Sequence, residues 1–104
     1  MTDSRQQREL PTPWPFDQSA NCAVFTTTHV IRDGAPITHV YHDADDHGWQ
    51  FHYPGEKTTA DAMLVGLGEI YQHDPTVAEV ADLPPGWRAI RSKVGGTWIR
   101  EKNE

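Results

Sequence analysis

β-Branched and aromatic residues form three runs between positions 22 and 53, and each run predicts a β-strand. The first run covers residues 22–31 and leads into the turn-forming sequence Arg32-Asp-Gly-Ala-Pro36. Residues 37–42 and 49–53 form the second and third strands, which the polar segment 43–48 joins as a hairpin.

Between residues 58 and 83 the hydrophobic spacing becomes helical, but two glycines interrupt it. Gly66 and Gly68 would each cost about 1 kcal/mol inside a helix. We therefore expect a short strand at residues 62–65, followed by a helix at residues 67–73.

A second short helix is predicted directly after the first. Asp74 and Pro75 supply an N-cap and a proline at the first helical position, which is the usual way for a helix to begin. The helix at residues 75–81 should bury Val77 and Val80, because their spacing places both side chains on one side.

The end of the chain predicts another hairpin. Residues 87–94 and 97–101 form its strands, and Gly95 and Gly96 suit the positive φ angles of a two-residue type I′ turn. This register gives one apolar face and one basic, aromatic face. The predicted core face carries Ile90, Val94 and Ile99, and the opposite face carries Trp87, Arg91, Lys93, Trp98 and Arg100.

Residues 1–20 have the character of an extended, proline-rich arm, because closely spaced prolines prevent helix formation. We expect Trp14 and Phe16 to pin this arm to the body by burying their rings. The alternatives are a proline-rich ligand for another protein, or an aromatic lid over a small-molecule site. Residues 21–104 then form a single α+β domain, with a mainly antiparallel sheet of about five or six strands and two short helices.

Composition limits the possible functions. The chain has 104 residues and a net charge of -6, which disfavours binding to nucleic acid or to an anionic membrane. No apolar run approaches the roughly 18 residues of a membrane span, so we expect a cytoplasmic protein. Cys22 is the only cysteine, and it therefore makes neither a disulfide nor a thiolate zinc site within one chain.

Four histidines and three aspartates crowd into residues 39–52, and imidazoles are common metal ligands. The candidate ligands are His39, His52 and His42. One hairpin register places His39 directly opposite His52, close enough to share a metal. A register shifted by one residue places His39 opposite Tyr53 and gathers the aromatic residues on one face. Hydrophobic burial favours the shifted register, which leaves the histidines as surface groups.

No complete motif for metal or catalytic chemistry accompanies this cluster. HExxH is absent, and the segment that begins Asp43-Ala-Asp45 lacks the glutamate that an EF-hand requires at its twelfth position. Nucleophile elbows and phosphate-binding glycine loops are also absent. We therefore assign no catalytic residue and no cofactor, and the remaining possibility of a nucleophilic Cys22 paired with His29 depends on the fold.

Charge is distributed unevenly along the chain. Between positions 39 and 82 the only Lys or Arg is Lys57, whereas five basic residues lie in the last part of the chain. The carboxylates of this acidic middle are Asp43, Asp45, Asp46, Glu56, Asp61, Glu69, Asp74, Glu79 and Asp82. An acidic surface without a catalytic signature fits a domain that docks on another protein, and a basic partner would complement its charge. Such a domain could itself be a monomer or a homodimer.

A wider pattern of residues resembles a family of small bacterial proteins of unknown function, related to the immunity-protein-thirty-three-like group. The pattern comprises Cys22-Ala-Val-Phe-Thr with Val30, Ala35-Pro-Ile37, the aspartate-rich turn before Gly48-Trp-Gln-Phe51, Leu67-Gly-Glu-Ile70, Asp74-Pro75, Asp82-Leu-Pro-Pro-Gly-Trp-Arg-Ala-Ile-Arg91 and Trp98. The group often has Asp-Ser-Gly-Trp at the turn, and here His47 replaces the serine. The resemblance implies a compact α+β domain that binds and neutralises a toxin, and it implies no catalytic residues.

The residues thus favour a noncatalytic cytoplasmic domain that works through protein-protein contact, with an immunity-like or regulatory role. The alternative is a histidine metal-binding protein with its site on the first hairpin.

Overall fold

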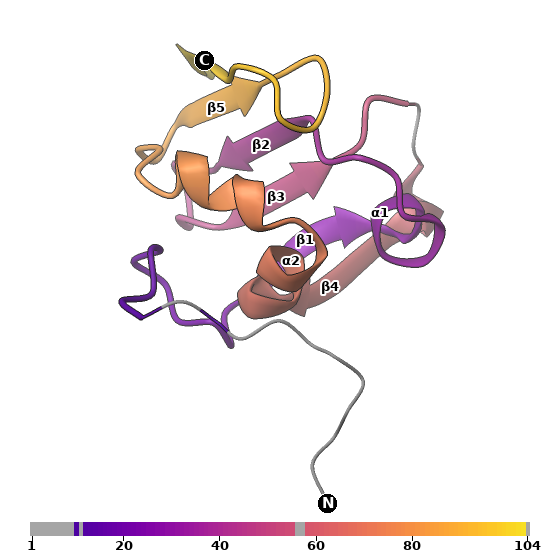
Figure 1. The fold of residues 1–104 in the computed structure, drawn as a ribbon, viewed down its shortest axis with the longest axis horizontal. Helices are drawn as coiled ribbons and strands as arrows, with labels where there is room; N and C mark the ends of the chain where they lie inside the picture. The colour runs from indigo at the N-terminus through magenta and orange to yellow at the C-terminus, as the bar shows by residue number, and fades with distance from the viewer. Residues whose placement is uncertain (1–9, 11, 56–57, 104) are drawn as a thin grey trace, which may run out of the picture.

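The computed structural model describes residues 10, 12–55 and 58–103 as an α+β fold built on a six-stranded sheet, as expected (Figure 1). The strand order is β4-β1-β3-β2-β5-β6. Neighbouring strands are antiparallel except β1 and β3, which are parallel. In chain order the elements are β1 (Ala23–Thr27), α1 (Thr28–Asp33), β2 (His39–His42), β3 (Trp49–His52), the 3-10 helix η1 (Thr59–Asp61), β4 (Ala62–Gly66), α2 (Leu67–His73), the 3-10 helix η2 (Pro75–Val80), β5 (Trp87–Ile90) and β6 (Ile99–Lys102).

Helix α1 replaces the second half of the strand predicted at residues 22–31, so that prediction is wrong beyond Thr27. Gly34 has a left-handed φ of 73° and ends the helix, while the N–H of Ala35 donates to the carbonyl of His29 at 2.9 Å. The glycine is therefore a helix C-cap, and β-branched composition did not prevent a helix that buries Val30. The predicted strand at 62–65 and helix at 67–73 are confirmed within one residue.

The first hairpin adopts the register that hydrophobic burial did not favour. His39 is paired with His52, and His42 is paired with Trp49. His42 therefore lies on the buried side, where the ring stacks on Trp49 at a centroid distance of 4.0 Å and Nδ1 donates to the carbonyl of Leu83 at 2.6 Å. The prediction of the shifted register is therefore wrong. The observed register is possible because these contacts accommodate a polar ring in the core.

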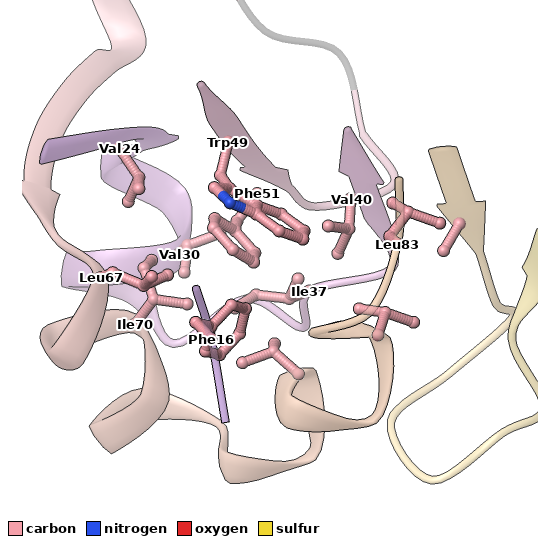
Figure 2. Close-up of a cluster of buried hydrophobic side chains, with 13 residues drawn as sticks. Phe16, Val24, Val30, Ile37, Val40, Trp49, Phe51, Leu67, Ile70 and Leu83 are labelled. Carbon is pink, nitrogen blue, oxygen red and sulfur yellow. The ribbon is translucent and has the colours of Figure 1, made fainter. Parts of the chain in front are cut away.

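One face of the sheet is covered by α2 and η2, which lie in front of the strands in Figure 1. Between these layers is the hydrophobic core, and Figure 2 shows Trp49 and Phe51 of β3 at its centre. Each large apolar side chain buried here stabilises the fold by about 1.5–3 kcal/mol. The core residues are Phe16, Val24, Val30, Ile37, Val40, Trp49, Phe51, Leu67, Ile70, Val77, Val80, Leu83 and Ala89.

The segment before β1 contributes to this core. Phe16 is 4% exposed, and its ring meets Trp49 edge-on at 5.4 Å. The side-chain oxygen of Gln18 accepts a hydrogen bond from the Trp49 indole at 2.8 Å. The half-buried Trp14 packs against Tyr71, with their ring centroids 5.9 Å apart. The expected burial of the aromatic rings is thus confirmed; residues 1–9 and 11 of the predicted arm lie outside the described residues.

The final hairpin differs from its prediction in both turn and faces. Ile90 pairs with Ile99, so residues 91–98 form a long loop and the predicted two-residue Gly95-Gly96 connection is wrong. The faces are also wrong, because Val94 and Ile99 are 47% and 61% exposed whereas Arg91 is 3% exposed. Arg91 had been placed on the basic, exposed face, yet it belongs to the buried side of the sheet.

A hydrogen-bond network holds Arg91 in place. Its guanidinium donates to the Ile37 carbonyl at 3.0 Å, to the Thr76 hydroxyl at 2.9 Å and to the Asp74 carboxylate at 2.8 Å. Trp98 covers the guanidinium, with its ring centroid 4.1 Å away. The other Asp74 oxygen accepts from the backbone N–H of Thr76 and caps η2. The buried charge is therefore paired, and its donors have partners on two segments of the chain, at Ile37 and at residues 74–76.

We predict that Arg91→Met lowers the free energy of unfolding by about 3–5 kcal/mol, because it leaves Asp74 without its charge partner in a largely buried site. Arg100→Met is the matched control, since the Arg100–Asp82 pair is exposed and such pairs contribute about 0–1 kcal/mol. Urea unfolding followed by tryptophan fluorescence measures both. Equal losses in the two variants would contradict the structural role assigned to Arg91.

Candidate functional site

The face of the sheet opposite α2 and η2 presents a mixed apolar and polar surface, here called the open face. Its most exposed apolar side chains are Phe25, Leu64 and Ile99, which are 48%, 61% and 61% exposed. Phe25 and Leu64 are direct cross-strand neighbours on β1 and β4. Apolar side chains gathered on one sheet face are typical of a surface that contacts another macromolecule. The open face also carries His39, Tyr41, Gln50, His52, Arg88, Ile90 and Glu101.

The histidine pair lies at the centre of the open face. His39 and His52 are opposite each other, as one of the two registers required. His39 Nδ1 lies 2.8 Å from the Thr38 hydroxyl, and His52 Nε2 lies 2.9 Å from the side-chain oxygen of Gln50. Because Gln50 donates its amide to Asp43 at 2.8 Å, its oxygen accepts from His52. His52, Gln50 and Asp43 therefore form a directed hydrogen-bond chain.

The third candidate ligand, His42, points to the opposite face and is 6% exposed. The structure therefore brings together His39 and His52 but separates His42 from them. Across residues 10, 12–55 and 58–103, no group of three His, Cys, Asp or Glu side chains is placed to hold a metal ion. Two imidazoles already engaged in hydrogen bonds are fewer than the three protein ligands of a typical zinc site.

The possible nucleophile and base are not joined either. Cys22 Sγ lies 3.7 Å from the carbonyl of Ala23, and the ring of His29 stacks on Tyr53 at 4.3 Å. These contacts direct the two side chains elsewhere, so the geometry provides no activated thiol.

The turn between β2 and β3 places acidic side chains at the end of the open face. The Asp43 N–H donates to the Gly48 carbonyl at 2.7 Å, and the Asp46 carboxylate accepts from the Gly48 N–H at 2.8 Å. His47 takes a positive φ of 59°, which allows the tight turn. Asp45 and Asp46 are consequently exposed, and Asp43 lies beside Gln50 of the open face.

A shallow hollow adjoins this turn, with a volume of about 280 Å³. It is large enough for one long side chain but small for a typical small-molecule site of roughly 300–1,000 Å³. Because three of the lining residues are carboxylates, the hollow suits a positively charged group. The lining residues are Asp43, Ala44, Asp45, Asp46, Gly86 and Asn103. We call this feature the aspartate hollow.

Two other carboxylates of the acidic middle are neutralised within the chain. Asp74 pairs with Arg91 at 2.8 Å, and Asp82 pairs with Arg100 at 2.7 Å. The hydrogen bond from Arg100 holds the pKa of Asp82 below its ordinary value. In contrast, no ion pair reaches the three aspartates of the hollow in the part of the chain that the structure describes.

Basic residues of the last hairpin likewise form ion pairs with carboxylates of the chain. Arg88 donates to Glu101 at 2.6 Å, and this bond raises the pKa of the Arg88 guanidinium. Arg91 and Arg100 bind Asp74 and Asp82, as described above. Three of the five basic groups that the sequence gathers at this end therefore have carboxylate partners, which removes most of the predicted basic face.

Comparison of the chain with protein-family models, with curated proteins and with solved structures found no match. Among the described residues, no helix has the length and apolar character needed to cross a membrane.

The sequence located the acidic turn and the histidines but missed two features of this region. Arg91, Arg100 and Trp98 return to η2 and occupy its polar groups, including Glu79, whose carboxylate accepts from the Trp98 indole at 3.0 Å. Only the three-dimensional pairing reveals that the aspartates of the hollow remain available, whereas Asp74 and Asp82, which flank η2, do not. Alternation along β1 and β4 could have indicated the exposed Phe25–Leu64 pair, because their neighbours Val24 and Val65 point to the other face.

We predict that zinc does not bind stoichiometrically at micromolar concentration and that His39→Ala and His52→Ala leave any weak heat of binding unchanged, since two imidazoles make an incomplete site. Isothermal titration of untagged protein tests this. Tight binding lost in both variants would establish a metal site on the first hairpin.

Proposed function

We propose that this chain is a noncatalytic cytoplasmic domain that binds a basic protein, with the aspartate hollow and the adjoining open face as its contact surface. The observation that carries the proposal is the position of the unneutralised aspartates. They stand at the end of a sheet face that also exposes apolar side chains, and Gln50 connects the two parts through its bond to Asp43.

Electrostatics supports a basic partner. The chain has a net charge of -6, Asp74 and Asp82 are neutralised internally, and three unneutralised aspartates gather at the turn between β2 and β3. Opposite charge on a partner accelerates encounter and disfavours wrong partners. An arginine or lysine that enters the aspartate hollow would also receive carboxylate acceptors, which favour the planar, multidentate guanidinium in particular.

Apolar contact would supply the rest of the binding energy. Phe25 exposes nearly half of its surface, and Tyr41 lies between the turn and the histidine pair on the same face. Interfaces commonly combine a central aromatic or apolar patch with a charged rim. On the open face the apolar patch of Phe25 and Leu64 lies on β1 and β4, and the aspartates lie at the turn between β2 and β3.

An immunity-like role is the form of the proposal that the family resemblance suggests. In that role the domain would occlude a functional surface of a toxin by binding it, without chemistry of its own. A regulatory domain would use the same surface. Either function requires a stable fold and a complementary surface, and it requires no arrangement of reactive groups.

The proposal predicts that Asp43→Asn combined with Asp45→Asn weakens partner binding at least tenfold at low salt, because two unneutralised charges leave the contact surface. Glu69→Gln on the outer side of α2 is the matched control and should retain binding, since Glu69 is exposed on the covered side of the sheet. Affinity for the captured partner is measured by surface plasmon resonance at two ionic strengths.

The partner is first captured from native-host lysate with a photo-crosslinking phenylalanine analogue at position 25, 45 or 69. Positions 25 and 45 should crosslink to the same protein, and position 69 should not. Failure to recover any protein at low salt, or equal crosslinking from all three positions, would refute the proposed surface.

A further inference from the structure

The two edge strands of the sheet differ in how they present their free backbone. β6 (Ile99–Lys102) carries the charged sequence Arg-Glu-Lys after Ile99, which discourages further strand pairing. β4 (Ala62–Gly66) has the sequence Ala-Met-Leu-Val-Gly, with neither charge nor proline. Sheet edges in soluble proteins usually carry charge, proline or a bulge to prevent edge-to-edge association. β4 therefore has the character of a strand that pairs with another chain.

The hydrogen bonds between β4 and β1 determine which groups face that edge. The Leu67 N–H donates to the Cys22 carbonyl at 2.8 Å, directly beyond the pair formed by Gly66 and Ala23. Hydrogen-bonded and non-hydrogen-bonded pairs alternate along an antiparallel ladder. Met63 and Val65 therefore direct their backbone groups toward β1, whereas Ala62, Leu64 and Gly66 direct theirs outward.

These outward-facing residues are symmetric about Leu64, so an antiparallel copy of the same strand can pair with them. We propose that two copies of this chain pair antiparallel along β4, about a two-fold axis at Leu64, to form one sheet continuous across both chains. Leu64 then lies opposite its own counterpart, and Ala62 lies opposite Gly66 of the second copy. The Ala62 N–H already donates to the Thr59 carbonyl within its own chain, so about four backbone hydrogen bonds are available from these three pairs.

The side chains favour a second copy over an unrelated peptide. A two-fold axis perpendicular to the sheet keeps the open faces of both copies on the same side. Leu64 and Phe25 are neighbours on that face, so pairing brings the same two residues of the second copy beside them. Leu64, which is 61% exposed in one chain, becomes the centre of a row of apolar side chains.

Charge does not oppose this arrangement, although each chain has a net charge of -6. The strand itself is neutral, and Asp61 is the nearest carboxylate before it. With the axis at Leu64, the two Asp61 residues lie six positions apart along the paired strands, on the order of 20 Å. At this separation physiological salt screens most of their repulsion.

Sedimentation velocity over a wide concentration range tests the proposal on purified protein, without any other partner. Wild type should change from monomer to dimer as concentration rises. Leu64→Lys should remain monomeric, because it places like charges directly opposite each other at the axis. Ile99→Lys makes the same change at an equally exposed residue on the other edge, and it should dimerise like wild type.

Circular dichroism confirms that both lysine variants are folded. A wild type that stays monomeric throughout, or a Leu64→Lys variant that still dimerises, would overturn the proposal.

A disulfide provides a geometric test. Directly opposed, hydrogen-bonded residues have Cα atoms about 5.5 Å apart, within the range a disulfide spans. In a Cys22→Ser background, mild oxidation should therefore couple Leu64→Cys into a covalent dimer and leave Ile99→Cys largely uncoupled. Equal coupling of both variants would contradict pairing through β4. These tests do not involve the aspartate hollow, so either proposal can fail without the other.

Discussion

The buried ion pair between Arg91 and Asp74 is the interaction on which the arrangement of the second half of the chain depends. Desolvating a guanidinium is costly, so the charge must meet a carboxylate and its donors must meet acceptors. Asp74, Thr76 and the Ile37 carbonyl satisfy this need. As a result the end of β5, the start of η2 and the approach to β2 are held together at one point.

The same ion pair shapes the molecular surface. Since Arg91 points to the covered side, the chain leaves the β5–β6 ladder and forms a long loop that carries Trp98 over the guanidinium. The loop returns the chain to β6, where Arg100 pairs with Asp82 beside η2. The two aspartates that flank η2 are thereby neutralised, whereas those at the turn between β2 and β3 are not. A buried ion pair thus influences which carboxylates on the surface remain unneutralised.

Local signals in the sequence were sufficient for much of the fold. Glycine positions separated β4 from α2, and Asp74 with Pro75 placed the start of η2, because these effects act within a few residues. Contacts between residues far apart in the sequence could not be predicted from such local signals. The hydrogen bond from His42 to the Leu83 carbonyl spans 41 residues, and it keeps on the buried side a histidine that pattern reasoning placed at the surface.

The candidate site likewise combines features that the sequence predicted with features that depend on contacts between distant residues. Composition identified the aspartates and the histidine pair, and one of two registers correctly placed His39 opposite His52. Internal neutralisation of Asp74 and Asp82 could not be read from sequence, because their partners Arg91 and Arg100 lie 17 and 18 positions away. Arg91 is at the start of a loop of unexpected length, and Arg100 is in β6 after it.

Packing of Phe16 against Trp49 also bears on how the protein is made. Phe16 leaves the ribosome early, but its place in the core exists only after β3 and α2 have been synthesised. β1 likewise pairs with β3 and β4, which both follow it, and Arg91 completes its network close to the end of the chain. Because so many contacts join positions that are distant in the sequence, the topology is of the kind that folds slowly for its size.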